Sequence, residues 1–133
     1  MSAVCPPHAI LVFLGGGLGA LARLWLTSVM LSLMPASPWP WGTFCVNLLG
    51  SFLIGLLAAL WGVLPVTQSW RLFLITGLLG GFTTFSALSL EALNLWRSQG
   101  ALWAVGYGMG SVMLGVCLAG FGFWLGKMLA SLA

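Results

Sequence analysis

The chain has 133 residues, of which 61% are hydrophobic and only 4% are charged, and its net charge is +3. A soluble domain carries roughly a quarter charged residues, so this composition excludes one and indicates an integral membrane protein surrounded by lipid. The charges are too few and too scattered for a nucleic-acid-binding surface; they are Arg23, Arg71, Arg97, Lys127 and Glu91.

The length of the chain limits how many times it can cross a membrane. A spanning helix needs roughly 20 apolar residues. Four such helices with short loops use up the chain, so we expect one all-α transmembrane domain over residues 1–133. The spans are expected at about residues 9–33, 43–61, 71–97 and 101–129.

The first span carries a face of small residues followed by a positive charge. Gly15 and Gly19, and likewise Gly16 and Ala20, are four residues apart, which is typical of helices whose backbones approach a neighbour closely. Arg23 follows one turn later. Its guanidinium either reaches the lipid head groups or presents a fixed positive charge to an aqueous vestibule that attracts anions.

A turn with three prolines at residues 34–42 leads into the second span, which has one polar stripe. Thr43, Asn47, Ser51 and Gly55 recur every four residues and so share a helix face. An amide inside a membrane needs a hydrogen-bond partner. Asn47 therefore either forms an interhelical hydrogen bond that holds the bundle together or is a donor that lines a polar path.

The third span contains Gly-Gly-Phe-Thr-Thr-Phe-Ser at residues 80–86. The glycine pair and the β-branched Thr83 and Thr84 disfavour helix, so we expect a break at about the middle of the membrane. Opened backbone groups are tolerated in hydrocarbon only against protein, water or an ion. The break is thus either a candidate ion site or a kink that lets helices pack closely.

Polar residues continue through the end of the third span and into the fourth. Glu91 lies about a turn and a half before Arg97 and the expected turn at 97–100, which favours a structural partner role near an interface over proton transport. Tyr107 and Ser111 share one face of the fourth span. The Tyr107 hydroxyl either belongs to an interfacial aromatic belt or is buried and needs a partner.

Small residues also recur along the fourth span. Gly106 and Gly110, like Gly122 and Gly126, are four residues apart and predict close helix contacts.

The positive charges give no preferred orientation in the membrane. With four spans, Arg71 and Lys127 fall on one side and Arg23 and Arg97 on the other. The Lys/Arg bias that normally sets topology is therefore absent. A chain without bias can insert both ways up, and two oppositely inserted copies can pair as an antiparallel homodimer with its two-fold axis in the membrane plane.

Three motifs together resemble the Fluc/CrcB family of fluoride ion channels. They are Gly-Gly-x-x-Gly-Ala-x-x-Arg ending at Arg23, Gly-Thr-x-x-Val-Asn ending at Asn47, and the 80–86 motif with Glu91 after it. Tyr107 and Ser111 extend the match into the fourth span. The third motif is the specific one.

The resemblance implies a passive, electrogenic fluoride export channel in the cell's inner (plasma) membrane, which protects the cell from fluoride and is not an enzyme. It implies a dual-topology homodimer with two antiparallel pores and a structural sodium ion at its centre. The carbonyls of Gly80 and Thr83 would hold the sodium. The fluoride pathway would include Thr43, Asn47, Phe85, Ser86, Tyr107, Ser111 and, in the vestibule, Arg23.

The sequence departs from the family pattern at two places. The position of a second pore phenylalanine is Leu88, and the polar track of the fourth helix is followed by Gly115 and Ala119 instead of further hydroxyls. Water or other donors would have to act where those groups are missing.

Two other functions are weighed against the channel. A proton-coupled exporter of the small multidrug type needs a carboxylate inside a helix, and the first span has none. A structural membrane subunit would use Asn47 and Phe85 only for folding.

Overall fold

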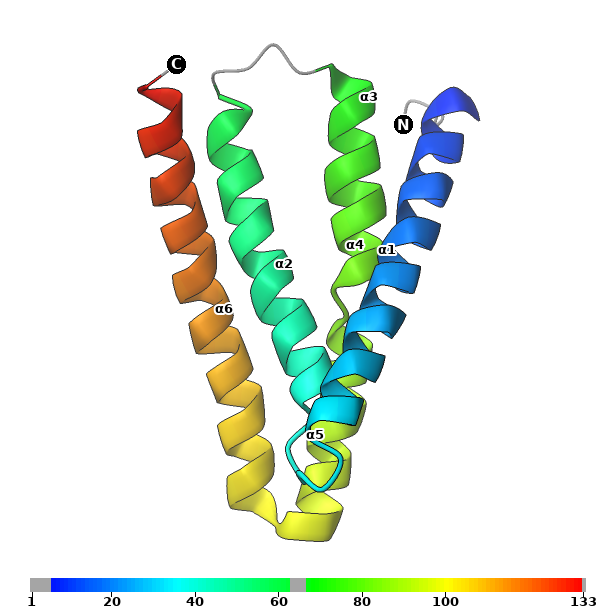
Figure 1. Ribbon diagram of the computed structural model, residues 1–133, viewed down its shortest axis with the longest axis vertical. Coiled ribbons are helices and arrows are strands. Elements are labelled where there is room, and N and C mark those ends of the chain that lie inside the picture. The colour runs from blue at the N-terminus through cyan, green and yellow to red at the C-terminus, as the bar shows by residue number, and fades with distance from the viewer. Residues whose placement is uncertain (1–5, 63–66, 133) are drawn as a thin grey trace.

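The computed structural model describes residues 6–62 and 67–132, and these residues form helices joined by turns, with no strand among them. The helices are α1 (Pro6–Leu33), α2 (Trp41–Leu60), α3 (Gln68–Arg71), η1 (Leu72–Leu79), α4 (Gly80–Phe82), α5 (Phe85–Gln99) and α6 (Ala101–Ala130). Four stretches of the described chain are long and apolar enough to cross a membrane: Pro7–Leu33, Trp41–Leu60, Gln68–Gln99 and Ala101–Ala130. Helix α1 begins and α6 ends at the same end of the bundle (Figure 1).

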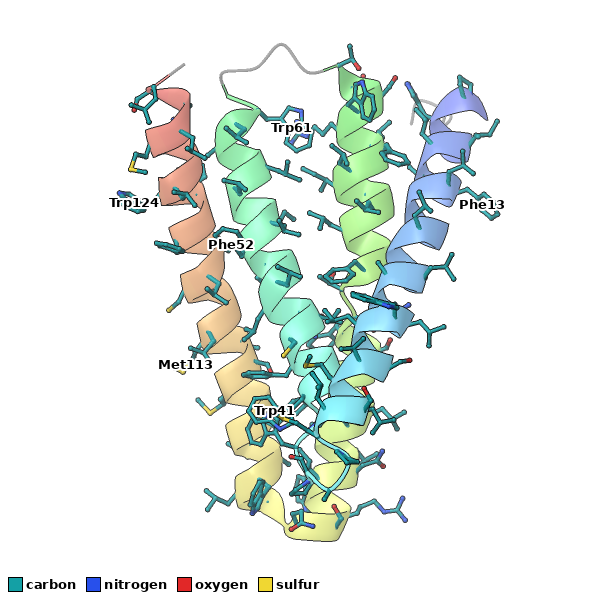
Figure 2. All side chains as sticks on the ribbon, in the orientation of Figure 1. Phe13, Trp41, Phe52, Trp61, Met113 and Trp124 are labelled. Carbon is teal, nitrogen blue, oxygen red and sulfur yellow. The ribbon has the colours of Figure 1, made fainter. Side chains whose placement is uncertain are left out.

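The outer surface of the bundle is apolar. Phe13, Met113 and Trp124 point away from the neighbouring helices (Figure 2) and are 78%, 62% and 58% exposed. In water such a surface would drive aggregation, whereas lipid tails are as apolar as these side chains. The fold is therefore that of a multi-pass membrane protein.

Helix α1 packs through glycines against the third of these stretches, Gln68–Gln99, which is called the third stretch below. A Cβ atom on Gly19 would overlap the carbonyl oxygen of Leu78, and one on Gly81 would overlap that of Gly16. A Cβ on Gly15 would likewise lie 2.5 Å from the carbonyl oxygen of Phe73. These contacts confirm the close approach predicted for the first small face.

Helix α6 packs mainly against α2, again through glycines. A Cβ on Gly122 would overlap the carbonyl oxygen of Phe52, and one on Gly126 would lie 2.8 Å from that of Leu56. The prediction is wrong for the earlier pair within this chain, because Gly106 and Gly110 have nothing within 4 Å of an added Cβ. These two glycines lie on the face of α6 that points away from the other helices of the chain.

The third stretch departs from helix two residues after its glycine pair. Gly80–Phe82 are helical, and the extended residues are Thr83 (φ −80°, ψ 155°) and Thr84 (φ −152°, ψ 120°). Gly81 instead provides the contact with α1, which explains why a glycine is placed there without ending the helix. Just before the pair, Leu72–Leu79 wind as a π-helix, a form that is frequent at functional sites.

The connections are shorter than the sequence indicates. Helix α2 begins at Trp41, inside the expected proline-rich turn at 34–42. Helix α5 continues to Gln99, so the expected turn at 97–100 is reduced to Gly100, whose φ of 98° favours glycine. This tight corner places α5 and α6 side by side.

The glycine contact between α1 and α4 predicts a stability change. We expect Gly81→Ala to lower the free energy of unfolding by about 1–3 kcal/mol, because the new methyl group has to displace the Gly16 backbone. The thermal unfolding midpoint of the purified protein in detergent measures the effect. Gly17→Ala is the matched control, since nothing lies within 4 Å of its Cβ. Equal midpoints for both variants would contradict the predicted contact.

Candidate functional site

A groove of about 360 Å³ opens between α2, the third stretch and α6. Both of the extended residues, Thr83 and Thr84, line it. Its other lining residues include Asn47, Ser51, Gly80, Phe85, Leu88 and Ser111. The groove therefore joins opened backbone, polar side chains and one aromatic ring in a single concave surface.

The Asn47 side chain pairs with the backbone of Thr84. Its Nδ2 donates to the Thr84 carbonyl oxygen at 3.1 Å, and its Oδ1 accepts from the Thr84 N–H at 2.8 Å. Gly50 makes room for this arrangement, because a Cβ there would overlap the methyl group of Thr83. The expected interhelical bond of Asn47 is confirmed, and one of its two amide protons is left over for the groove.

The carbonyls of helical Gly80 and extended Thr83 have lost the donors that a continuous helix would give them. In a continuous helix the Gly80 carbonyl would accept from the Thr84 N–H, and the Thr83 carbonyl from the Ala87 N–H. Here the Thr84 N–H donates to Asn47, and the Ala87 N–H donates to the Thr84 hydroxyl at 3.2 Å. The two carbonyl oxygens are consequently available to another partner, such as a cation.

Side chains do not offer a competing metal site in the described ranges, where no group of three or more His, Cys, Asp or Glu residues is assembled.

Glu91 joins three helices outside the groove. Its carboxylate accepts from the hydroxyl of Thr43 on α2 at 2.7 Å and from that of Tyr107 on α6 at 2.6 Å. Tyr107 is 0% exposed, and the Trp39 ring meets it edge-on with ring centres 5.4 Å apart. The predicted structural role of Glu91 and the predicted buried hydroxyl of Tyr107 are both confirmed.

The structure brings only some of the predicted pathway residues together. Asn47, Phe85 and Ser111 line the groove, and the Phe85 ring is 77% exposed. Ser86 lies beside them, with its hydroxyl 3.1 Å from that of Thr84.

Three other predicted pathway residues are not among those that line the groove. Thr43 and Tyr107 donate to Glu91, and Arg23 lies half-buried on α1. Their place on an ion pathway stays a prediction.

The sequence analysis did not predict the hydrogen bonds that Thr84 forms. This residue caps α5, since its hydroxyl accepts from the Ala87 N–H, and its peptide group is the partner of Asn47. A threonine directly before the first residue of a helix is a recognisable N-cap signal, because its hydroxyl can accept from the free amide of the second or third helical residue. The pairing with Asn47 has no comparable signal, because the two residues are 37 positions apart.

The pairing of Asn47 with Thr84 predicts that Asn47→Asp is destabilising. The carboxylate cannot donate to the Thr84 carbonyl and places like charge density against it. We expect a loss of about 1–3 kcal/mol in the free energy of unfolding, measured by thermal denaturation in detergent.

Asn94→Asp is the control for that variant, because Asn94 is exposed on α5. The same loss in both variants would mean that the Asn47 pairing contributes nothing specific.

Comparisons with known proteins agree on one family. The family described as CrcB-like protein, Camphor Resistance (CrcB), matches residues 10–123. A "Fluoride-specific ion channel FluC" of Mesorhizobium japonicum is 40% identical over 122 residues, 92% of this chain and 98% of that protein. Proteins of the same description are 46% identical in Hyphomonas neptunium (89% of this chain, 94% of that protein) and in Thermus thermophilus (90% and 95%).

Proposed function

The chain belongs to the CrcB family, and we propose that it is a fluoride-selective ion channel that lets fluoride leave the cell passively and so limits fluoride toxicity. Its relatives are described as ion channels, not as enzymes. The observation that carries the proposal is the groove, in which Asn47 and the exposed Phe85 ring flank the extended backbone.

The chemistry of the groove suits a small anion. An anion leaving water loses its hydration shell at a large cost unless hydrogen-bond donors replace it. Asn47 has an amide proton to offer, and the edge of the Phe85 ring carries positive charge density. Ser86 has a nearby hydroxyl on the proposed route, and Ser111 lines this route although its own proton bonds the Tyr107 carbonyl. Thr43, Tyr107 and Arg23 belong to the outer parts of the route.

Passive flow fits this site better than proton-coupled export. The one carboxylate of the chain, Glu91, is engaged by two hydroxyls and lies outside the groove. No carboxylate lines the groove among the described residues, so the site has no group that could exchange protons for cargo. A negative-inside membrane potential then drives fluoride outward.

The functional unit is proposed to be an antiparallel homodimer in the inner (plasma) membrane. The even distribution of positive charge supports insertion in both orientations. The helix break, proposed to lie at mid-membrane, would then come next to its counterpart in the second copy. Gly80, at this break, is exposed and open to such a partner.

A sodium ion is proposed at the centre of that dimer. The Gly80 and Thr83 carbonyls fit this role, because both have lost their helical donors. Hard cations prefer several oxygen ligands, so two carbonyls from each copy would complete a site that neither chain holds alone. The sodium would supply positive charge and hold the breaks together.

The direct test of the proposed function is ion flux. Liposomes that contain the purified protein should release fluoride when a potassium ionophore relieves the charge imbalance, and they should release little chloride. A fluoride electrode and a chloride electrode measure the two rates. Equal rates, or vesicles that retain fluoride as protein-free vesicles do, would overturn the proposal.

The proposed dimer predicts sensitivity to added charge. Replacing Ser98 and Gln99 with lysine places two positive charges at one end of the bundle and should bias insertion toward one orientation. Fluoride efflux from cells should fall, because one orientation lacks partners. Asparagine at both positions is the neutral control. Full activity of the lysine variant would contradict dual insertion.

A further inference from the structure

The direction of each hydroxyl proton decides which groups of the groove can bind an anion. A serine or threonine hydroxyl has one proton to donate. The Thr83 hydroxyl donates to the Leu79 carbonyl at 2.9 Å, and the Ser111 hydroxyl donates to the Tyr107 carbonyl at 2.7 Å. Both protons are already used, and these two hydroxyls present lone pairs to the groove instead.

Ser51 differs from the other groove hydroxyls. Its side chain takes part in none of the side-chain hydrogen bonds found among residues 6–62 and 67–132. Besides Ser51, the donors left in the groove are the second amide proton of Asn47 and one proton of the hydroxyl pair Thr84 and Ser86. Ser51 is thus the groove serine whose proton is free.

Ser51 lies opposite a glycine of the neighbouring helix. A Cβ built on Gly115 would be 3.2 Å from the Ser51 hydroxyl oxygen, so this oxygen points across the α2–α6 contact. Gly115 is one helical turn after Ser111, and Ser51 is one turn after Asn47. The Ser51 hydroxyl therefore occupies the space that a serine side chain at position 115 would enter.

From this geometry we propose that Ser51 is a fluoride-contacting residue of the pathway, and that it supplies from α2 the hydroxyl that α6 lacks at Gly115. The inference rests on the proposed channel function. The step from Asn47 to Ser51 along α2 is four residues, or about 6 Å. Fluoride released by the free amide proton of Asn47 then meets the next free donor of the groove.

Removal of the hydroxyl tests the proposal. Ser51→Ala should reduce the fluoride efflux rate from liposomes about tenfold, because a hydrogen bond to a charged group is lost at one step of the path. Ser98→Ala is the control and should leave efflux unchanged, since that exposed hydroxyl only bonds the Asn94 carbonyl. Rates are compared for protein that elutes at the wild-type size.

Moving the hydroxyl separates a pathway role from a packing role. Ser51→Gly should slow efflux, and adding Gly115→Ser in the same chain should restore most of it, since the emptied space accepts the new side chain. Efflux of Ser51→Ala within twofold of the wild type, or no recovery in the double variant, would overturn the role of Ser51. Wild-type vesicles that retain fluoride would instead overturn the channel function itself.

Discussion

The structure depends on how the opened backbone at Thr83 and Thr84 is satisfied. Backbone polar groups inside a membrane cost several kcal/mol each when they are unpaired. Asn47 removes that cost at Thr84, because its amide pairs with both polar groups of this residue as a neighbouring strand would. The carbonyls of Gly80 and Thr83 remain without their helical donors. The same feature that interrupts the helix thus leaves both an unused amide proton on Asn47 and carbonyl oxygens without their helical donors.

The rest of the bundle holds this interrupted segment rigidly. Glycines bring α1 into backbone contact with the residues before the break, and Gly50 lets α2 receive the Thr83 methyl group. Beyond the break, Glu91 ties α5 to both α2 and α6 through Thr43 and Tyr107. Packing in membranes depends on such close contacts and buried hydrogen bonds, because lipid offers no hydrophobic driving force between helices. The break can therefore persist as a fixed site.

The sequence predicted the helices and their small faces because both follow from local patterns. Apolar length indicates a span, and glycines four residues apart indicate a contact. The glycine pair at 80–81 was less informative, since glycine serves both a break and a close approach, and Gly81 serves the second. The site was predictable only as a set of residue types. The partner of Thr43 is 48 positions away, and no periodicity could reveal that its proton is directed to Glu91 instead of the groove.

Proton direction is also what distinguishes an anion path from a merely polar groove. A hydroxyl that has already donated its proton has only lone pairs left, and lone pairs do not replace the water protons around an anion. Ser111 and Thr83 are polar in the sequence, yet in the groove they act as acceptors. In the proposed channel, groups with an unused proton, among them Asn47 and Ser51, would lower the cost of stripping water from fluoride. Apolar neighbours such as Leu88, which also lines the groove, would strengthen this selection in the proposed channel, because they offer an ion no polar partner.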